Sequence, residues 1–272
     1  MITFPKAKIN LGLRVTGKRI DGFHDIETIF YPVGLSDALE FVVSSEKVNE
    51  DNLVVTGLNT GIRSGKNLVI KAAITLREKY NFPFLKIHLH KAIPVGAGLG
   101  GGSSDAAGIL KAINKCFSLS VNENEIKAIA LDLGSDCPFF IESLPSFATG
   151  RGEVLQPIDA VLDGYYIVLV NPRISISTRV AYHNCDPVIP EISLKELINY
   201  PASEWKDLIV NDFEDYVFNV YPQIGTLKIA LYNSGALFSS MSGSGSTVYG
   251  IYYEIPEIPE HIKDFVIYEG WL

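Results

Sequence analysis

Five glycines lie within the seven residues from Gly96 to Gly102, inside the segment KAIPVGAGLGGGSSD that runs from Lys91 to Asp105. Such a cluster is costly to order, because glycine loses more backbone freedom on folding than any other residue. A loop of this composition is useful where another group must approach the backbone closely. Bare amides beside a helix start suit a phosphate group, so the segment predicts a phosphate-binding loop.

A helical pattern follows this loop, with apolar residues at Ala106, Ile109, Leu110, Ile113 and Phe117. We expect a helix here, and the side chain of Ser104 or Asp105 can cap it by accepting a hydrogen bond from an early amide. A helix start directly after the glycines adds the positive end of a helix dipole to the loop. The alternative is a flexible turn that is rich in glycine for no ligand-related reason.

The rest of the chain mixes strand-like and helical segments. We expect strands over residues 39–43, 85–89 and 165–170 and near Phe147, and helices over residues 67–80 and 124–133, the latter ended by Gly134. Residues 156–164 are the expected crossover between two halves. Helices dominate beyond Leu194 until a second glycine segment, MSGSGSTV, precedes a strand. Because the order lacks a strict β-α rhythm, the fold class predicted is α+β rather than a doubly wound parallel sheet.

Two familiar phosphate loops do not fit the glycine segment. A Walker A loop requires Gly-Lys followed by Ser or Thr, but the two Gly-Lys pairs are followed by Arg19 and Asn67. A Rossmann G-x-G-x-x-G pattern matches by letters from Gly96, yet the first glycine should directly follow a strand. The expected strand ends at Leu89, and the acidic residue sought about 20 positions later would be Glu123, in a polar loop. A dinucleotide site is therefore disfavoured.

The pattern P-x-G-x-G-L-G-[GS]-S-S, from Pro94 to Ser104, resembles the phosphate loop of the GHMP kinases (galactokinase, homoserine kinase, mevalonate kinase and phosphomevalonate kinase). The resemblance implies a two-domain fold. Residues 1–155 would form an ATP-binding domain like domain 2 of ribosomal protein S5, and residues 156–272 a ferredoxin-like α/β domain. The residues implied to bind ATP are Pro94, Val95, Gly96, Ala97, Gly98, Leu99, Gly100, Gly101, Gly102, Ser103 and Ser104.

Further segments are similar to one branch of these kinases: PKAKINLGL, GKRIDGFHDIETIF, VGLSDALEF, KNLVIKAA, GSDCPFFI, ATGRGEVL, NDFE and MSGSGSTV. They extend from Lys6 to Val248 and are together far more specific than the glycine loop. The resemblance implies ATP-dependent phosphorylation of the 2-hydroxyl of cytidine diphosphate methylerythritol in the non-mevalonate isoprenoid precursor pathway. Two alternatives stay open: another GHMP small-molecule kinase, and a catalytically silent nucleotide-binding regulator that kept the fold.

By the same resemblance, Lys8 and Asp136 match the catalytic residues of the family. An aspartate with an ordinary pKa of about 3.9 is a weak base for an alcohol, and a nearby ammonium lowers that pKa further. The expected role of Lys8 is therefore electrostatic, while Asp136 orients the hydroxyl and accepts its proton late, as a loose phosphoryl-transfer transition state allows. Read without the family, Lys8 could be a solvated charge and Asp136 a turn or capping residue.

The substrate contacts implied by the resemblance are Asn10, Phe23, His24 and Tyr182. Phe23 and His24 occupy a Tyr-His dipeptide that flanks the cytosine, so Phe23 keeps a ring for stacking but lacks the phenol hydroxyl. An imidazole can read a base edge because it both donates and accepts. Taken alone, Phe23 and His24 could be an exposed loop pair and Tyr182 a core residue. ATP and Mg²⁺ are the expected cofactors, with Ser103 or Ser104 as candidate Mg²⁺ contacts.

Charge and cysteine content exclude several classes of partner. The formal charge of −8 disfavours nucleic acid and anionic membranes. Three cysteines, none in a C-x-x-C pair, favour a reducing cytoplasm over a disulfide framework, and we expect neither a signal peptide nor a membrane span. His88 and His90 lack a third zinc ligand nearby in sequence, and Cys137 is expected to pack rather than react. The sequence leaves a monomer and a homodimer equally open.

Overall fold

The computed structural model describes residues 1–45, 48–59, 61 and 64–272, and these form two compact units. The first comprises Met1–Ala7, Leu35–Val95 and Gly100–Ser143, and the second comprises Lys8–Gly34, Gly96–Leu99 and Leu144–Leu272. Both combine a sheet with helices, as expected for an α+β chain. The glycine-rich segment contributes residues to each unit. A domain division near residue 155 stays a prediction.

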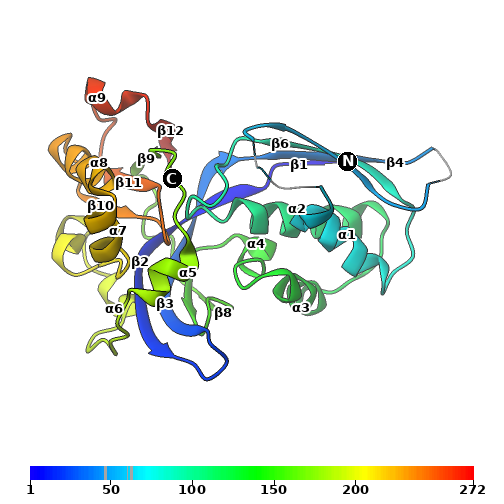
Figure 1. Ribbon diagram of the computed structural model, residues 1–272, viewed down its shortest axis with the longest axis horizontal. Coiled ribbons are helices and arrows are strands. Elements are labelled where there is room, and N and C mark those ends of the chain that lie inside the picture. The colour runs from blue at the N-terminus through cyan, green and yellow to red at the C-terminus, as the bar shows by residue number, and fades with distance from the viewer. Residues whose placement is uncertain (46–47, 60, 62–63) are drawn as a thin grey trace. The chain divides into compact units, whose positions relative to one another are not determined.

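The first unit is a four-stranded sheet in the order β1-β4-β6-β5, in which only the β5–β6 pair is parallel. Figure 1 shows α1, α2 and α3 along one face of this sheet. The expected alternation holds in β6, where Leu85, Ile87 and Leu89 are buried. Its elements are β1 (Ile2–Thr3), β4 (Ala38–Val43), β5 (Asn52–Gly57), η1 (Ser64–Lys66), α1 (Leu68–Arg77), β6 (Leu85–Lys91), α2 (Gly101–Cys116), α3 (Glu123–Leu133) and α4 (Phe139–Glu142).

The start of α1 and the end of α3 lie at residues typical of helix ends, but the start of α2 differs from the one expected. Asn67 caps α1 by accepting from the amide of Val69 at 2.9 Å, and α3 ends at Gly134 as expected. The capping prediction for α2 was wrong: the helix begins at Gly101, and Gly100 stands at the cap without a side chain to offer. Ser104 and Asp105 are instead buried inside the helix, because Gly101 and Gly102 form its first two residues.

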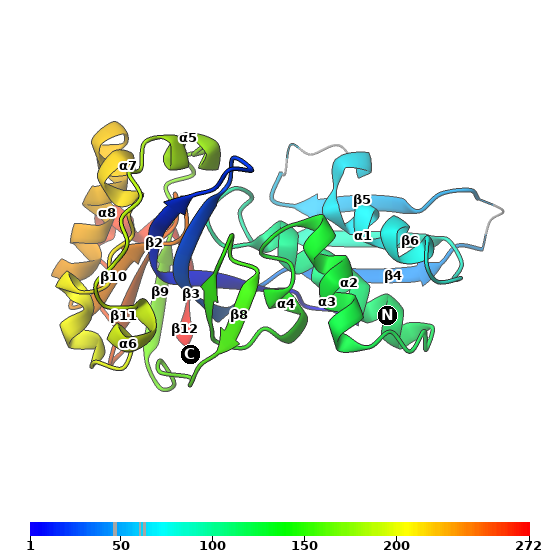
Figure 2. The same ribbon diagram turned by 90° about the horizontal axis from the view of Figure 1, so that it is seen from below.

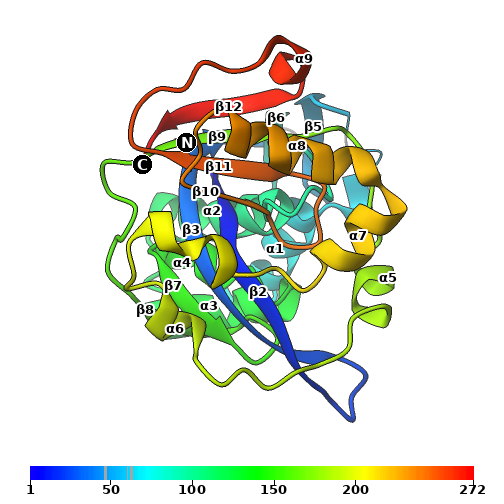
Figure 3. The same cartoon turned by 90° about the vertical axis from the view of Figure 1, so that its left-hand side faces the viewer.

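The second unit contains two four-stranded sheets, β2-β3-β7-β8 and β10-β11-β9-β12. Figure 2 shows β2, β3 and β8 of the first of them, and Figure 3 shows α7 and α8 beside β10 and β11 of the second. The elements are β2 (Lys6–Lys18), β3 (His24–Ser36), β7 (Ser146–Thr149), β8 (Val154–Pro157), β9 (Tyr166–Val170), α5 (Thr178–His183), α6 (Leu194–Leu197), η2 (Ala202–Asp207), α7 (Glu214–Val220), α8 (Pro222–Asn233), β10 (Phe238–Met241), β11 (Val248–Tyr252), α9 (Glu260–Lys263) and β12 (Val266–Trp271).

One hydrophobic core unites distant parts of the second unit. Leu13, Val15 and Ile26 from β2 and β3 belong to the same buried cluster as Val168 of β9 and Leu231 of α8. Burying an aliphatic side chain contributes about 1.5–3 kcal/mol, so this cluster fixes the two long strands firmly. As a result the core anchors β2, the strand that carries the polar side chains of Lys8 and Asn10.

Candidate active site

The glycine-rich segment makes a tight turn in the second unit. Gly98 has a φ of +80°, and a Cβ atom there would overlap the backbone carbonyl of Ser242. The second glycine segment therefore packs against the first. A hydrogen bond of 3.3 Å from the amide of Thr247 to the carbonyl of Ala97 joins the same two turns.

Lys8 and Asn10 lie on β2 against these turns. Both side chains are almost completely buried, with 3% and 2% of their surface exposed. Lys8 Nζ donates to Asn10 Oδ1 and, at 3.1 Å, to the carbonyl of Gly98, and it lies 4.8 Å from the centre of the Phe30 ring. Lys8 is therefore not a solvated charge near the terminus. A buried cation held in one direction can stabilise a developing negative charge strongly.

Asn10 is fixed from several sides as well. Its Nδ2 donates to Thr28 Oγ1 at 2.9 Å, and its backbone amide donates to Ser242 Oγ at 3.1 Å. With the amide nitrogen committed to Thr28, the Oδ1 atom is left to face Lys8. The structure thus brings Lys8, Asn10 and Gly98 of the predicted set into one hydrogen-bonded group.

The other half of the glycine segment starts α2 in the first unit. Gly101 is buried: a Cβ atom there would lie 2.8 Å from Ile93 Cγ2. Gly102 is exposed and Ser103 partly so. The first amides of a helix have no partner within it, and the helix dipole adds about half a positive charge at that end. This start is suited to an anion.

Ser104 is less accessible than the sequence suggested. The residue is only 3% exposed, and its hydroxyl donates to the carbonyl of Lys6 at 2.6 Å. Ser103 is therefore the better placed of the two serines for contact with a ligand.

Asp136 occupies the turn before α4 and is partly exposed. The next residue, Cys137, is fully buried. Burial raises the pKa of Cys137 to about 11, which outweighs the lowering by Ser103. The expected burial of Cys137 is confirmed.

Sequence analysis missed a buried cluster of charged side chains next to the start of the first glycine segment. Lys91 Nζ donates to Asp37 Oδ2 and, at 2.8 Å, to Asp105 Oδ2. Asp37 Oδ1 accepts from the amides of Ala92 and Ile93 at 2.6 and 2.9 Å, directly before the glycines. Burial raises the pKa of Asp105 to about 7 against the opposing effect of Lys91. An aspartate and a lysine inside otherwise apolar segments were the only signal available.

The expected base-binding residues form aromatic contacts in the second unit. His24 stacks on Tyr182, with ring centres 4.9 Å apart and planes inclined by 16°, and Tyr182 meets Phe213 edge-on at 4.8 Å. Phe23 is 51% exposed, and the guanidinium of Arg151 lies 4.9 Å from its ring centre. Arg151 was not predicted, although it stands in the ATGRGEVL segment.

Among the described residues, no three His, Cys, Asp or Glu side chains are grouped so that they could hold a metal ion. His88 and His90 both contact Thr56, at 2.8 and 3.1 Å. Within the same residues, no helix is both long and apolar enough to cross a membrane.

Comparison with known proteins extends these observations. Residues 67–143 match the N terminal domain of GHMP kinases and residues 193–265 match their C terminal domain. Proteins named 4-diphosphocytidyl-2-C-methyl-D-erythritol kinase match closely. That of Parabacteroides distasonis is 50% identical over all of both chains, and that of Bacteroides thetaiotaomicron is 48% identical over 96% of this chain and 95% of its own.

Solved structures agree with this assignment. A crystal structure of 4-(cytidine 5'-diphospho)-2C-methyl-D-erythritol kinase superposes with a TM-score of 0.78 at 30% identity, covering 92% of this chain and 90% of that one. Mevalonate kinase of Methanococcus jannaschii shares the fold alone, with a TM-score of 0.66 at 13% identity over 97% and 92% of the two chains. The expected two-domain α+β kinase fold is confirmed. On both sequence and structure, the chain belongs to the ATP-dependent GHMP kinases and, among them, to the 4-diphosphocytidyl-2-C-methyl-D-erythritol kinase family.

Proposed function

We propose that the protein transfers the γ-phosphoryl group of ATP to the 2-hydroxyl of 4-diphosphocytidyl-2-C-methyl-D-erythritol, a step in isoprenoid precursor synthesis. The observation that carries this proposal is the buried ammonium of Lys8, held by Asn10 and by the carbonyl of Gly98 in a glycine turn. A cation fixed at such a loop serves phosphoryl transfer. A silent nucleotide-binding regulator would have no need to keep it.

The ATP phosphates are assigned to residues 94–104, where glycine amides and the start of α2 supply N–H donors. Because no group of carboxylates suited to a metal occurs among the described residues, we propose that Mg²⁺ enters with ATP, with the Ser103 hydroxyl as the available protein oxygen. When bound, the ion neutralises negative charge on the phosphates.

Asp136 and Lys8 are assigned to the transfer itself. Asp136 accepts a hydrogen bond from the 2-hydroxyl, orients its oxygen toward the γ-phosphorus and takes the proton as the new O–P bond forms. The bond from the γ-phosphorus to its bridging oxygen breaks, and ADP leaves with that electron pair. Lys8 stabilises the negative charge that spreads over the moving oxygens, which is where most of the rate acceleration arises in phosphoryl transfer.

The cytosine is assigned to Phe23, His24 and Tyr182, and Asn10 is assigned as a polar contact to the substrate as a whole. Since the His24 ring already covers one face of Tyr182, a base that stacks on that face must displace the imidazole. Phe23 supplies a ring without a hydroxyl, so hydrogen bonding to the base falls to His24. Stacking of this kind is worth about 0.5–1.5 kcal/mol.

We further propose that the enzyme works in the cytoplasm on small molecules, without nucleic acid or a membrane, as a monomer or homodimer. Cys116, Cys137 and Cys185 are all free, which suits a reducing compartment. The charge of −8 opposes anionic polymers and surfaces.

The deciding experiment measures ADP release with the cytidine substrate, galactose, homoserine and mevalonate. Turnover with the first alone supports the proposal, and turnover with another acceptor alone refutes it. Asp136→Asn is expected to lower kcat by at least about 10²-fold, the usual scale for a lost acid-base group, while the KM for ATP stays within about twofold. Asp132→Asn, an exposed change on α3, is the matched control. An Asp136→Asn enzyme within a few-fold of the parent would refute the assigned mechanism.

A further inference from the structure

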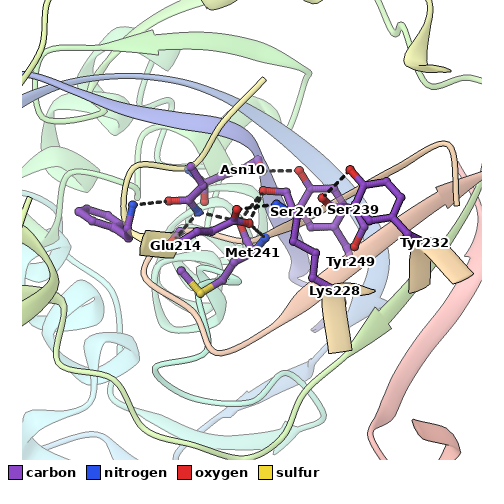
Figure 4. Close-up of polar contacts among 11 residues, drawn as sticks. Asn10, Glu214, Lys228, Tyr232, Ser239, Ser240, Met241 and Tyr249 are labelled. Atoms are coloured by element: carbon purple, nitrogen blue, oxygen red, sulfur yellow. Dashed lines mark hydrogen bonds and ion pairs between the residues drawn. The ribbon is translucent and has the colours of Figure 1, made fainter. Parts of the chain in front are cut away.

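A buried carboxylate fixes the end of β10 (Figure 4). Glu214 Oε1 accepts from Ser240 Oγ at 3.0 Å and from the amide of Met241 at 2.8 Å, while Lys228 Nζ donates to Oε2 at 2.6 Å. Both carboxylate oxygens are therefore partnered. Hydrogen bonds to an ionised acceptor are about twice as strong as neutral ones, so β10 is anchored directly before the second glycine turn.

Asn211 holds the same stretch from the other side. Its Nδ2 donates to the carbonyl of Met241 at 2.7 Å and to that of Gly243 at 2.9 Å, and its Oδ1 accepts from the amide of Phe213 at 3.0 Å. One side-chain amide thus binds the residues on both sides of Ser242. The backbone of Ser242 is clamped, and its side chain has a defined direction.

The Ser242 hydroxyl uses that direction to join two other segments. It donates to the carbonyl of Gly98 at 2.9 Å and accepts from the amide of Asn10 at 3.1 Å. The residue is completely buried. Tyr249 adds a third restraint, because its hydroxyl donates to the carbonyl of Asn10 at 2.8 Å (Figure 4).

We propose that Ser242 is a positioning residue for the Lys8 ammonium. Gly98 and Asn10 both accept hydrogen bonds from Lys8, and one hydroxyl binds both of them. Glu214 and Asn211 serve this arrangement by fixing the chain around Ser242. The inference rests on the proposed catalytic role of Lys8. Since a displacement of about 1 Å can lower a rate about 10²-fold, loss of the hydroxyl is expected to act on kcat.

Three buried serines in one short segment supply a matched series. Ser242 bonds Gly98 and Asn10, Ser240 bonds Glu214, and Ser239 Oγ has no hydrogen-bond partner among the described residues. Ser239→Ala therefore removes a buried hydroxyl without removing a side-chain hydrogen bond, and parental activity is expected. Ser242→Ala is expected to lower kcat about 10–100-fold, with the KM values for ATP and the cytidine substrate within about twofold. Ser242→Cys has a weaker donor and acceptor, so its kcat should lie between those of Ser239→Ala and Ser242→Ala.

The comparison is made on folded protein, with Tm measured for every variant. A Ser242→Ala enzyme that keeps the kcat of Ser239→Ala, or that loses kcat only in proportion to its unfolded fraction, contradicts the proposal. Crystal structures of the two variants give a readout independent of turnover. Lys8 Nζ should leave the Gly98 carbonyl in Ser242→Ala alone, and an unmoved Lys8 contradicts the inference. If the parent enzyme phosphorylates none of the acceptors, the proposed function fails, and the position of Lys8 still decides whether Ser242 sets it.

Discussion

In each compact unit a buried carboxylate holds the chain just before a glycine turn, but the two carboxylates have different charged partners. Asp37 binds the amides of Ala92 and Ile93 ahead of the first glycine segment, and Glu214 binds the amide of Met241 ahead of the second. In both units the anchored amides lie before the glycines and not among them.

The difference lies in how the negative charge is balanced. In the first unit Asp37 shares Lys91 with Asp105, and Asp105 Oδ1 has no hydrogen-bond partner among the described residues. In the second unit both oxygens of Glu214 are satisfied by Lys228 and by neutral donors. The first cluster therefore holds two carboxylates for one ammonium, and protonation of Asp105 relieves that imbalance.

The largest effect is expected for Asp37→Ala, because it leaves two amides before the glycine loop without an acceptor. An unsatisfied buried donor costs about 1–3 kcal/mol, so the free energy of unfolding in urea should fall by about 2–5 kcal/mol. Asp37→Asn is the control, since its Oδ1 atom can still accept from both amides and less stability should be lost. Equal losses in the two variants would show that charge, rather than the anchoring of the loop, is what Asp37 supplies.

Glu214→Ala should have a smaller effect of the same kind, about 1–3 kcal/mol, because one amide and one hydroxyl lose their acceptor. Lys228, with 24% of its side chain exposed, can turn to water once it is released. Glu214→Gln keeps an acceptor for Met241 and is the matched control in the same urea titration. A loss as large as that of Asp37→Ala would remove the distinction between the two units.

The last prediction concerns pH. Burial raises the pKa of Asp105 from 3.8 to about 7, so the folded protein binds this proton more tightly than the unfolded chain. The stabilisation is full below pH 4 and is lost as pH rises toward 7. Asp105→Asn cannot ionise, so its Tm relative to the parent should rise between pH 5 and pH 8, by about 2–4 °C for each kcal/mol. Asp37 and Lys91, which face Asp105, are unchanged in both proteins.

Asp132→Asn on the exposed side of α3 controls for the loss of a carboxylate, and the pH dependence of Asp105→Asn is compared with it. A flat difference for Asp105→Asn as well would mean that the surplus charge of the first unit is not carried by Asp105.

Much of the fold could be predicted from the sequence where apolar spacing was regular. Helices α1, α2 and α3 and strands β4, β6 and β9 lie where expected, to within a few residues. The long strands β2 and β3 were not recognised, because their central residues are buried without alternation and period two disappears. The cap of α2 was misplaced because glycine, without a side chain, gives no capping signal.

The site, too, could be predicted only in part. Motif resemblance supplied Lys8, Asp136 and the glycine segment, whose assigned roles stay predictions. It did not indicate Asp37, Glu214 or Ser242 as anchors, because their partners lie 14 to 232 positions away in the chain. Hydrogen bonds between such distant residues exist only once the tertiary structure has formed, and no local pattern encodes them.

The carbonyl of Gly98 accepts from two donors at once, Lys8 and Ser242. Each donor draws electron density toward the oxygen, and the shared resonance of the peptide group passes the shift to the nitrogen of Leu99. Cooperative strengthening is about 10–30% per bond. The N–H of Leu99, within the segment assigned to the phosphates, is thereby made more acidic than an ordinary amide. Besides the direct role assigned to Lys8 in the transfer, Lys8 and Ser242 would in this way strengthen the hydrogen bond from one backbone amide to the nucleotide.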